Sequence, residues 1–385
     1  MPLFKSKKSK PSLAAPAPYD NSGAWPAGGP DRGPNELHAA PHHLPPPAGA
    51  ATHARAGLAN DEIQTDEELP NKPYKYAPEL SKTGINVGGL PVNVFGLSEL
   101  TPSTSRALRP RVPDVAVVIH MHGRGGSADN EERIVRHLWD CVNRSKAHTQ
   151  RQRLPLGDQA GGDQREFLLV SFDARNHGHR LTDAVGQKGW KQGNKRHALD
   201  LYSMIRGTAQ DVSHLVDMLP SYLFPQSDRE VVQWCVTGKS LGGHAAWHVL
   251  ANDPRVTVGV PFIGCPSYAN LLADRTKTSF VTNGPPYVPH ALAQLVRQTD
   301  PASRPYWEHD ARVNPFYGKK ICICSGANDK LVPWRCSREF VENLVVGPTQ
   351  RPSDGLKVVL VEGAGHEVTE GMIEEAGEWI YAWMR

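Results

Sequence analysis

The sequence is poor in the features that mark secreted and membrane-spanning proteins. It has no run of 18 or more apolar residues, and no apolar segment of a secretory signal stands near its start. We therefore expect neither a membrane-spanning helix nor export. Cysteine is scarce as well: there are six, without a C-x-x-C pair, and five lie in apolar strands or helices or at their ends. This usage is typical of a reducing compartment, and we expect a cytoplasmic protein.

An excess of charge of one sign is also missing. The chain has 43 Lys and Arg against 40 Asp and Glu, a net charge of +3. This balance offers no electrostatic basis for binding nucleic acid or a membrane surface. The basic cluster at the start, formed by Lys5, Lys7, Lys8 and Lys10, is better interpreted as part of a solvated tail than as a targeting signal.

β-Branched and aromatic residues are sparse in the first 75 positions, which are crowded with Pro, Ala, Gly and His. Such a segment buries too little apolar surface to offset the entropy lost on ordering. We expect residues 1–75 to be a disordered tail. Residues 76–385 are long enough for one α/β domain with a substantial core.

The rest of the sequence alternates between strand and helix patterns. A hairpin is predicted over Gly84–Leu97, because two β-like halves flank a Gly-Gly pair. Six continuous apolar runs predict inner strands, at Val115–Gly123, about Phe167–Phe172, Glu230–Gly238, Arg255–Pro266, Lys319–Asp329 and Leu356–Glu367. Helices are predicted at Ala128–Asn143, Asp200–Leu219, directly after Ser240, near Cys336–Leu344, and at Glu374–Met384. Continuous apolar strands separated by helices predict an α/β fold with a mostly parallel sheet covered on both faces.

Residues 267–318 interrupt this alternation. They are rich in Pro, Asn and Thr, with two short helical pieces near Tyr268–Asp274 and Pro289–Arg297. The insertion follows a strand whose carboxyl end should border a ligand site. We expect a small lid, in which Leu271 and Leu272 contact substrate.

The stretch "VTGKSLGGHAAW" places Ser240 between an apolar strand and a helix. Gly238 and Gly242 flank the serine in the pattern G-x-S-x-G. A serine in such a sharp turn is exposed as a nucleophile, and side chains at the two glycine positions would collide with neighbouring backbone. The helix that follows directs free N–H groups at the reacting centre. The pattern therefore favours a nucleophile over a simple turn residue.

A serine nucleophile needs a histidine to accept its proton and a carboxylate to orient that histidine. Asp329 follows the strand in "ICICSGAND", and His366 follows the strand in "VVLVEGAGH". The chain order Ser, Asp, His and the two strand ends are those expected for partners of a nucleophile elbow. We predict Ser240, Asp329 and His366 as a catalytic triad.

A serine hydrolase also needs two N–H donors for the oxyanion of its tetrahedral intermediate. The elbow supplies the backbone N–H of Leu241. The loop "HGRGGS", after the strand at Val115–Gly123, has glycines that let backbone approach a substrate. We predict the backbone N–H of Arg124 as the second donor.

Together, "HGRGGS", "GKSLGG", "GAND" and "GAGH", in this order and spacing, resemble the α/β-hydrolase superfamily, in particular its intracellular esterase, dienelactone-hydrolase and prolyl-oligopeptidase-like members. "DARNHGHR" and "GNKRHALDLY" are similar to segments of uncharacterised fungal α/β-hydrolases. The resemblance covers about Gly84 to Arg385. It implies the α/β-hydrolase fold and serine hydrolase chemistry but leaves the substrate undefined. The segment before Gly84 is too short for a β-propeller, so we do not expect the architecture of a true prolyl oligopeptidase.

Three further groups of polar residues have open interpretations. His120 and His122 share one face of a strand end, but no third metal ligand is evident, and His122 is expected to support the oxyanion loop. Asp173, Arg175 and His177 are expected to brace their loop rather than contact substrate. Trp190, Asn194 and His197 lie on the same sheet edge, and the sequence leaves a pocket wall and a structural role equally open.

The sequence therefore predicts a serine hydrolase that cleaves a small carboxylic ester through an acyl-enzyme, without a cofactor or a metal. A peptidase or amidase with the same machinery is one alternative. A catalytically silent binding or scaffold protein of the same fold is another, disfavoured by the complete set of triad residues. Epoxide hydrolase and dehalogenase chemistry would need a carboxylate at the elbow. Oligomeric state stays open.

Overall fold

A computed structural model describes residues 80–101, 114–153, 165–349 and 355–385. The predicted disordered tail, residues 1–75, lies outside the described residues. Among the helices that the structure describes, none combines the length and apolar character needed to cross a bilayer.

Eight strands form one sheet in the order β1-β2-β4-β3-β5-β6-β7-β8. β1 pairs antiparallel with β2, and β2 pairs antiparallel with β4, whereas every other pairing is parallel. The strands are β1 Lys82–Val87, β2 Leu90–Phe95, β3 Asp114–Met121, β4 Glu166–Phe172, β5 Glu230–Lys239, β6 Val256–Phe262, β7 Lys320–Gly326 and β8 Leu356–Val361. The predicted hairpin and all six predicted strands are present. The last of them, β8, was expected to be an inner strand but lies at the edge of the sheet, and its residues are at most partly buried. Gly88 and Gly89 both have positive φ, 58° and 90°, which explains the Gly-Gly pair in the hairpin turn.

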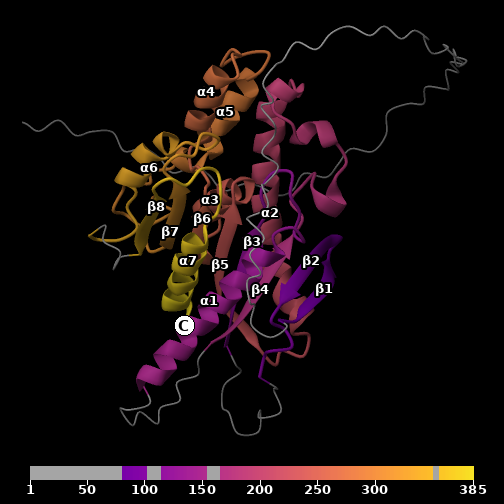
Figure 1. The fold of residues 1–385 in the computed structure, drawn as a ribbon, viewed down its shortest axis with the longest axis vertical. Helices are drawn as coiled ribbons and strands as arrows, with labels where there is room; N and C mark the ends of the chain where they lie inside the picture. The colour runs from indigo at the N-terminus through magenta and orange to yellow at the C-terminus, as the bar shows by residue number, and fades with distance from the viewer. Residues whose placement is uncertain (1–79, 102–113, 154–164, 350–354) are drawn as a thin grey trace, which may run out of the picture. The chain divides into compact units, whose positions relative to one another are not determined.

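Helices cover both faces of the sheet (Figure 1). Side chains of β3 alternate between the two resulting cores: Val115, Val117 and Ile119 lie in one, and Ala116 and Val118 in the other. The first core is closed by α2 His197–Leu223, α3 Leu241–Asn252 and α6 Arg338–Asn343, and the second by α1 Glu132–Arg153 and α7 Glu370–Met384. The predicted α/β class is therefore confirmed.

Several predicted helix ends were inaccurate: α1 ends at Arg153 rather than Asn143, α2 begins at His197 rather than Asp200, and α7 begins at Glu370 rather than Glu374. α1 was expected from Ala128 but begins at Glu132, because residues 128–131 form turns held by side chains. The Ala128 N–H donates to Asp173 Oδ1 at 2.8 Å, and the Asn130 N–H donates to Ser127 Oγ at 3.2 Å. The segment from β4 to α2, with no predicted structure, contains three short 3₁₀ turns, Gly178–Arg180, Ala184–Gln187 and Trp190–Gln192.

Between β6 and β7 the chain leaves the sheet to form α4 Tyr268–Thr278, α5 His290–Thr299 and a 3₁₀ turn at Pro301–Ser303. The two helical pieces expected in this insertion are confirmed. Asp300 holds the start of α4: its Oδ2 accepts the backbone N–H groups of Tyr268 at 2.8 Å and Ala269 at 3.3 Å. Burial raises the pKa of this carboxyl to about 8, against the lowering effect of these two N–H groups. Asp300 is thus protonated in the folded protein at neutral pH.

We expect Asp300→Asn to flatten the pH dependence of stability. The folded pKa, about 8, lies above the unfolded value of 3.8, so Asp300 contributes stability fully below about pH 4 and loses that contribution as the pH rises to 8. Between about pH 4 and pH 8, the free energy of unfolding of the wild type should fall by roughly 1 kcal/mol per pH unit more than that of Asp300→Asn. Urea unfolding at pH 5, 6, 7 and 8 measures the difference, and parallel profiles for the two proteins would contradict it.

Candidate active site

The carboxyl ends of the parallel strands meet at one edge of the sheet, where Ser240 lies between β5 and α3. Ser240 has φ 52° and ψ −105°, a conformation that residues other than glycine rarely adopt. Such strain is stored where the surrounding structure enforces it, and it exposes the hydroxyl above the sheet.

The two flanking glycines permit this turn through close backbone contacts. A Cβ on Gly238 would lie 2.4 Å from the carbonyl carbon of Gly242, and a Cβ on Gly242 would lie 2.1 Å from the carbonyl oxygen of Met121. Both distances are far shorter than any real Cβ contact. α3 can therefore pack against the ends of β3 and β5 only with glycine at both positions.

The structure brings the three predicted triad residues together. His366 Nε2 lies 2.8 Å from Ser240 Oγ, and His366 Nδ1 lies 2.7 Å from Asp329 Oδ2. The second oxygen of Asp329 accepts the backbone N–H groups of Leu331 at 2.8 Å and Val332 at 2.9 Å. With both oxygens occupied, the carboxylate is fixed in one orientation and directs the histidine at the serine.

Asp329 is buried, with a residue exposure of 4 %, yet it is ionised. Burial alone would raise the pKa of its carboxyl, but the hydrogen bond and charge of His366 and the two backbone N–H groups lower it below its usual value. An ionised Asp329 accepts a hydrogen bond from the N–H at His366 Nδ1, which leaves Nε2 as the acceptor for the Ser240 proton. This is the tautomer that a general base requires.

The loop after β3 lies directly against the start of α3. The Gly242 N–H donates to the His122 carbonyl at 3.1 Å, and His122 supports the loop through both ring nitrogens. Its Nε2 accepts the Ala174 N–H at 2.9 Å, so Nδ1 carries the proton and donates to the Gly123 carbonyl at 2.7 Å. The expected support of this loop by His122 is present.

The two backbone N–H groups predicted for the oxyanion, those of Leu241 and Arg124, make no backbone hydrogen bond to any residue that the structure describes. Leu241 is the first residue of α3, so its N–H has no partner within the helix. Position 123 is close to the serine, since a Cβ on Gly123 would lie 3.8 Å from Ser240 Cβ. Both donors thus belong to segments adjoining the Ser240 hydroxyl.

Beneath the elbow lies a buried polar cluster that the sequence did not reveal. His120 Nδ1 lies 2.8 Å from Thr237 Oγ1, and its Nε2 lies 3.6 Å from Glu131 Oε2. Lys239 Nζ lies 3.6 Å from the other Glu131 oxygen. Burial would raise the pKa of Glu131, but His120 and Lys239 lower it overall. Glu131 precedes a helix as one of several polar residues, so no pattern distinguished it.

No group of three or more His, Cys, Asp or Glu side chains in the described ranges is arranged to hold a metal ion.

The loop after β4 is braced from two sides. Asp173 accepts N–H groups from Ala128 at 2.8 Å and His179 at 2.7 Å, while Arg175 pairs with Asp211 on α2 at 3.0 Å. His177 packs edge-on against His122, with ring centroids 5.1 Å apart.

Trp190 and His197 lie beside each other near the amino end of α2, with ring centroids 5.1 Å apart. Trp190 also meets Tyr287 of the insertion, at 6.1 Å. Burial, and then the charges of Arg275 and Arg124, lower the pKa of His197 to about 3, so this imidazole is neutral. Asn194 instead holds the turn through the Lys188 carbonyl and Asp200.

Leu271 and Leu272 lie on the buried side of α4. Leu271 is fully buried against Cys265, Val332 and Cys336, whereas Leu272 belongs to the cluster that contains Leu241 and Tyr268. Both leucines attach α4 to the body of the protein, and their predicted contact with substrate stays a prediction.

We expect Leu271→Ala to lower the free energy of unfolding by about 3 kcal/mol, because a fully buried leucine loses both its transfer free energy and its packing. Denaturant unfolding measures this loss. Leu295→Ala, at a partly buried position on α5, is the matched control and should cost less than half as much. Equal losses for the two variants would show that α4 is not anchored through Leu271.

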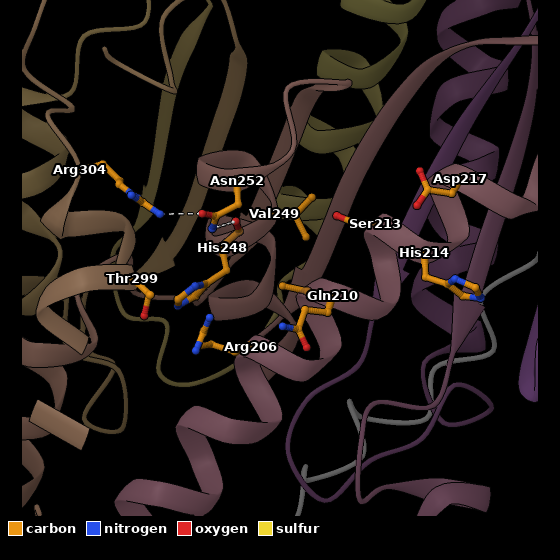
Figure 2. A pocket seen from close by; sticks show the side chains of 11 residues that line it. Arg206, Gln210, Ser213, His214, Asp217, His248, Val249, Asn252, Thr299 and Arg304 are labelled. Carbon is orange, nitrogen blue, oxygen red and sulfur yellow. Dashed lines mark hydrogen bonds between the residues drawn. The ribbon is translucent and has the colours of Figure 1, made fainter. Parts of the chain in front are cut away.

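A separate pocket of about 440 Å³ lies between α2, α3 and the segment after α5 (Figure 2). Arg206 of α2, His248 of α3 and Arg304 line it, together with Asn252, whose Oδ1 accepts from Arg304 Nη2 at 2.9 Å. None of the residues predicted for the active site lines this pocket.

No protein-family model matches this chain, and no curated protein matches it either. Among solved structures, TT1662 from Thermus thermophilus has a TM-score of 0.52 and 19 % identity, covering 80 % of this chain and 99 % of that one. Acetyl xylan esterase 1 from Thermoanaerobacterium sp. has a TM-score of 0.47 and 14 % identity, covering 79 % of this chain and 87 % of that one. Esterase Pf2001 from Pyrococcus furiosus has a TM-score of 0.43 and 18 % sequence identity, covering 80 % of this chain and 93 % of that one.

At such low sequence identities, the similarity shows a shared fold but not a shared activity. The mostly parallel eight-stranded sheet covered by helices on both faces is that of the α/β-hydrolase fold. The chain therefore has the α/β-hydrolase fold expected from its motifs.

Proposed function

We propose that the protein is a serine hydrolase that cleaves a carboxylic ester through an acyl-enzyme intermediate. The observation that carries this proposal is the pair of hydrogen bonds joining Asp329 to His366 and His366 to Ser240, at 2.7 and 2.8 Å, with the serine in a strained turn. Nucleophile, base and orienting carboxylate then have the mutual geometry that acyl transfer requires.

In the proposed reaction, Ser240 Oγ forms a bond to the acyl carbon while His366 Nε2 takes the hydroxyl proton. The negative charge that develops on the carbonyl oxygen is stabilised by the N–H groups of Leu241 and Arg124. His366 then gives its proton to the departing alkoxide as the ester bond breaks. A water molecule, deprotonated by His366, attacks the acyl-enzyme, and the proton returns to Ser240 as the acid leaves.

We further propose that residues 267–318 act as a lid over this site and that Trp190 and His197 form part of the substrate pocket. Trp190 meets both His197 and Tyr287 of the insertion, which ties the two segments together. Leu271 and Leu272 contribute by holding α4 in place. An ester is favoured over an amide because an alkoxide needs less help to leave than an amine does.

A fluorophosphonate probe and a panel of esters with graded acyl chains test the proposed function. Labelling at Ser240, identified by mass spectrometry, together with Ser240-dependent ester cleavage is the expected result. Turnover of amides at comparable rates would assign a peptidase or amidase instead. Failure of the folded protein to label would indicate a silent protein of the same fold.

A further inference from the structure

Arg275 on α4 has a guanidinium that lacks a carboxylate partner. Its Nη2 makes one long hydrogen bond, 3.4 Å, to the Leu331 carbonyl, while Nε and Nη1 are buried without an acceptor among the described residues. The preceding residue, Asp274, pairs instead with Arg335 at 2.7 Å. Leu331 also donates its N–H to Asp329, so this guanidinium lies next to the segment that holds the triad carboxylate.

A second guanidinium, that of Arg124, approaches from the loop after β3. Arg124 follows Gly123, which adjoins Ser240, and its Nη1 donates to the Gln187 carbonyl at 2.9 Å. Burial, and then the charge of Arg275, lower the pKa of Arg124 to about 10, so this guanidinium is cationic at neutral pH. Burial lowers the pKa of Arg275 as well, but a guanidinium keeps its proton in proteins. One guanidinium therefore belongs to the loop that adjoins Ser240, and the other to the helix beside the segment that holds Asp329.

Among the titratable groups around this pair, Asp329 is ionised, and its negative charge opposes the burial that lowers the pKa of Arg275. Tyr268 is protonated at neutral pH, because burial raises the pKa of its hydroxyl above the usual value. His197 and His244 are neutral, since burial, and then Arg275, lower their pKa values to about 3. Asp329 is committed to His366, Leu331 and Val332. In the part of the chain that the structure describes, neither Arg124 nor Arg275 forms an ion pair.

Buried charges in proteins are normally paired, because an unpaired one keeps its desolvation cost without compensation. Planar guanidinium groups match carboxylates through two parallel hydrogen bonds. The unpaired Nε and Nη1 of Arg275 each share an edge of the guanidinium with Nη2, whose one hydrogen bond is long. We propose that Arg124 and Arg275 bind a carboxylate carried by the substrate, so that the protein acts on anionic esters, such as hemiesters of dicarboxylic acids. This inference rests on the proposed serine hydrolase function.

Two matched ester series test this substrate class. In the first, monomethyl succinate, glutarate and adipate are compared with methyl butyrate, valerate and hexanoate, so that a carboxylate replaces a methyl group on the acyl side. In the second, butyrate esters of glycolic and 3-hydroxypropionic acids are compared with ethyl and propyl butyrate. We expect kcat/KM to favour the anionic member in at least one series by roughly 10- to 100-fold.

Arg275→Gln should abolish most of this preference, lowering the ratio of kcat/KM for anionic to neutral ester by at least about tenfold. High salt should lower the wild-type ratio in the same direction. Arg297→Gln changes an exposed arginine on α5 of the same insertion and should leave the ratio at its wild-type value.

A stability measurement separates a binding arginine from a structural one. Because Arg275 is unpaired in the free protein, Arg275→Met should hold or raise the melting temperature without ligand. Adding glutarate should raise the melting temperature of the wild type by a few degrees and that of the variant by less. A fall of several degrees on Arg275→Met would assign a structural role and overturn the proposal.

The outcomes also distinguish this inference from the function on which it rests. If neutral esters are cleaved and Ser240 labels, but no anionic ester is preferred in either series, the carboxylate site is wrong and the hydrolase assignment stands. If no ester of either kind is cleaved and Ser240 does not label, the proposed function itself fails.

Discussion

Ser240→Ala is expected to reduce ester turnover by on the order of 10⁴-fold or more, while the melting temperature changes by no more than about 2 °C. The substitution removes only Oγ, the atom that lies 2.8 Å from His366 Nε2. Alanine, like serine, carries a Cβ, so the φ of 52° at this position is no more strained than before. Activity and stability should therefore separate sharply, which is the signature of a nucleophile in a rigid turn.

Purified wild type and variant are compared in an ester assay, by fluorophosphonate labelling and by thermal unfolding. Ser203→Ala, at an exposed position on α2, is the matched control and should keep both activity and labelling. Retention of more than about a tenth of wild-type activity by Ser240→Ala would exclude this serine as the nucleophile, since removing a nucleophile costs far more than tenfold.

The serine turn and its partners could be predicted from sequence because each follows from the ends of strands. Apolar runs locate β5, β7 and β8, and parallel strands bring their carboxyl ends to one edge. A serine, an aspartate and a histidine at three such ends are then neighbours, even though 126 residues separate Ser240 from His366. No knowledge of side-chain packing is needed for this step.

The polar environment of the site could not be predicted in this way. Arg275 stands in "ADRTKT", which has the composition of an exposed helix turn, and only the packing of α4 buries its guanidinium. Glu131 pairs beneath the elbow with His120 and Lys239, which come from two different strands. Such contacts depend on how separate segments pack, and they leave no periodic pattern in the sequence.

Gly242→Ala is expected to lower ester turnover strongly, although it changes no reacting atom. The new Cβ would lie 2.1 Å from the Met121 carbonyl oxygen, and since real Cβ contacts stay beyond 3.0 Å, α3 and β3 must separate by about 1 Å. That movement lengthens the hydrogen bond from the Gly242 N–H to the His122 carbonyl, now 3.1 Å. Displacements of this size cost on the order of 10²-fold in rate.

Gly371→Ala supplies the matched control for Gly242→Ala. Gly371 lies in the first turn of α7, where an added Cβ would meet nothing within 4 Å, so alanine should stabilise the helix by roughly 0.5–1 kcal/mol and leave kcat/KM unchanged. Gly242→Ala should instead lose activity and several degrees of melting temperature. If the variant folds with wild-type stability and turnover, the close contact between the elbow and β3 does not hold the oxyanion donors in place. In that case, the N–H groups of Leu241 and Arg124 would not be the pair that stabilises the oxyanion.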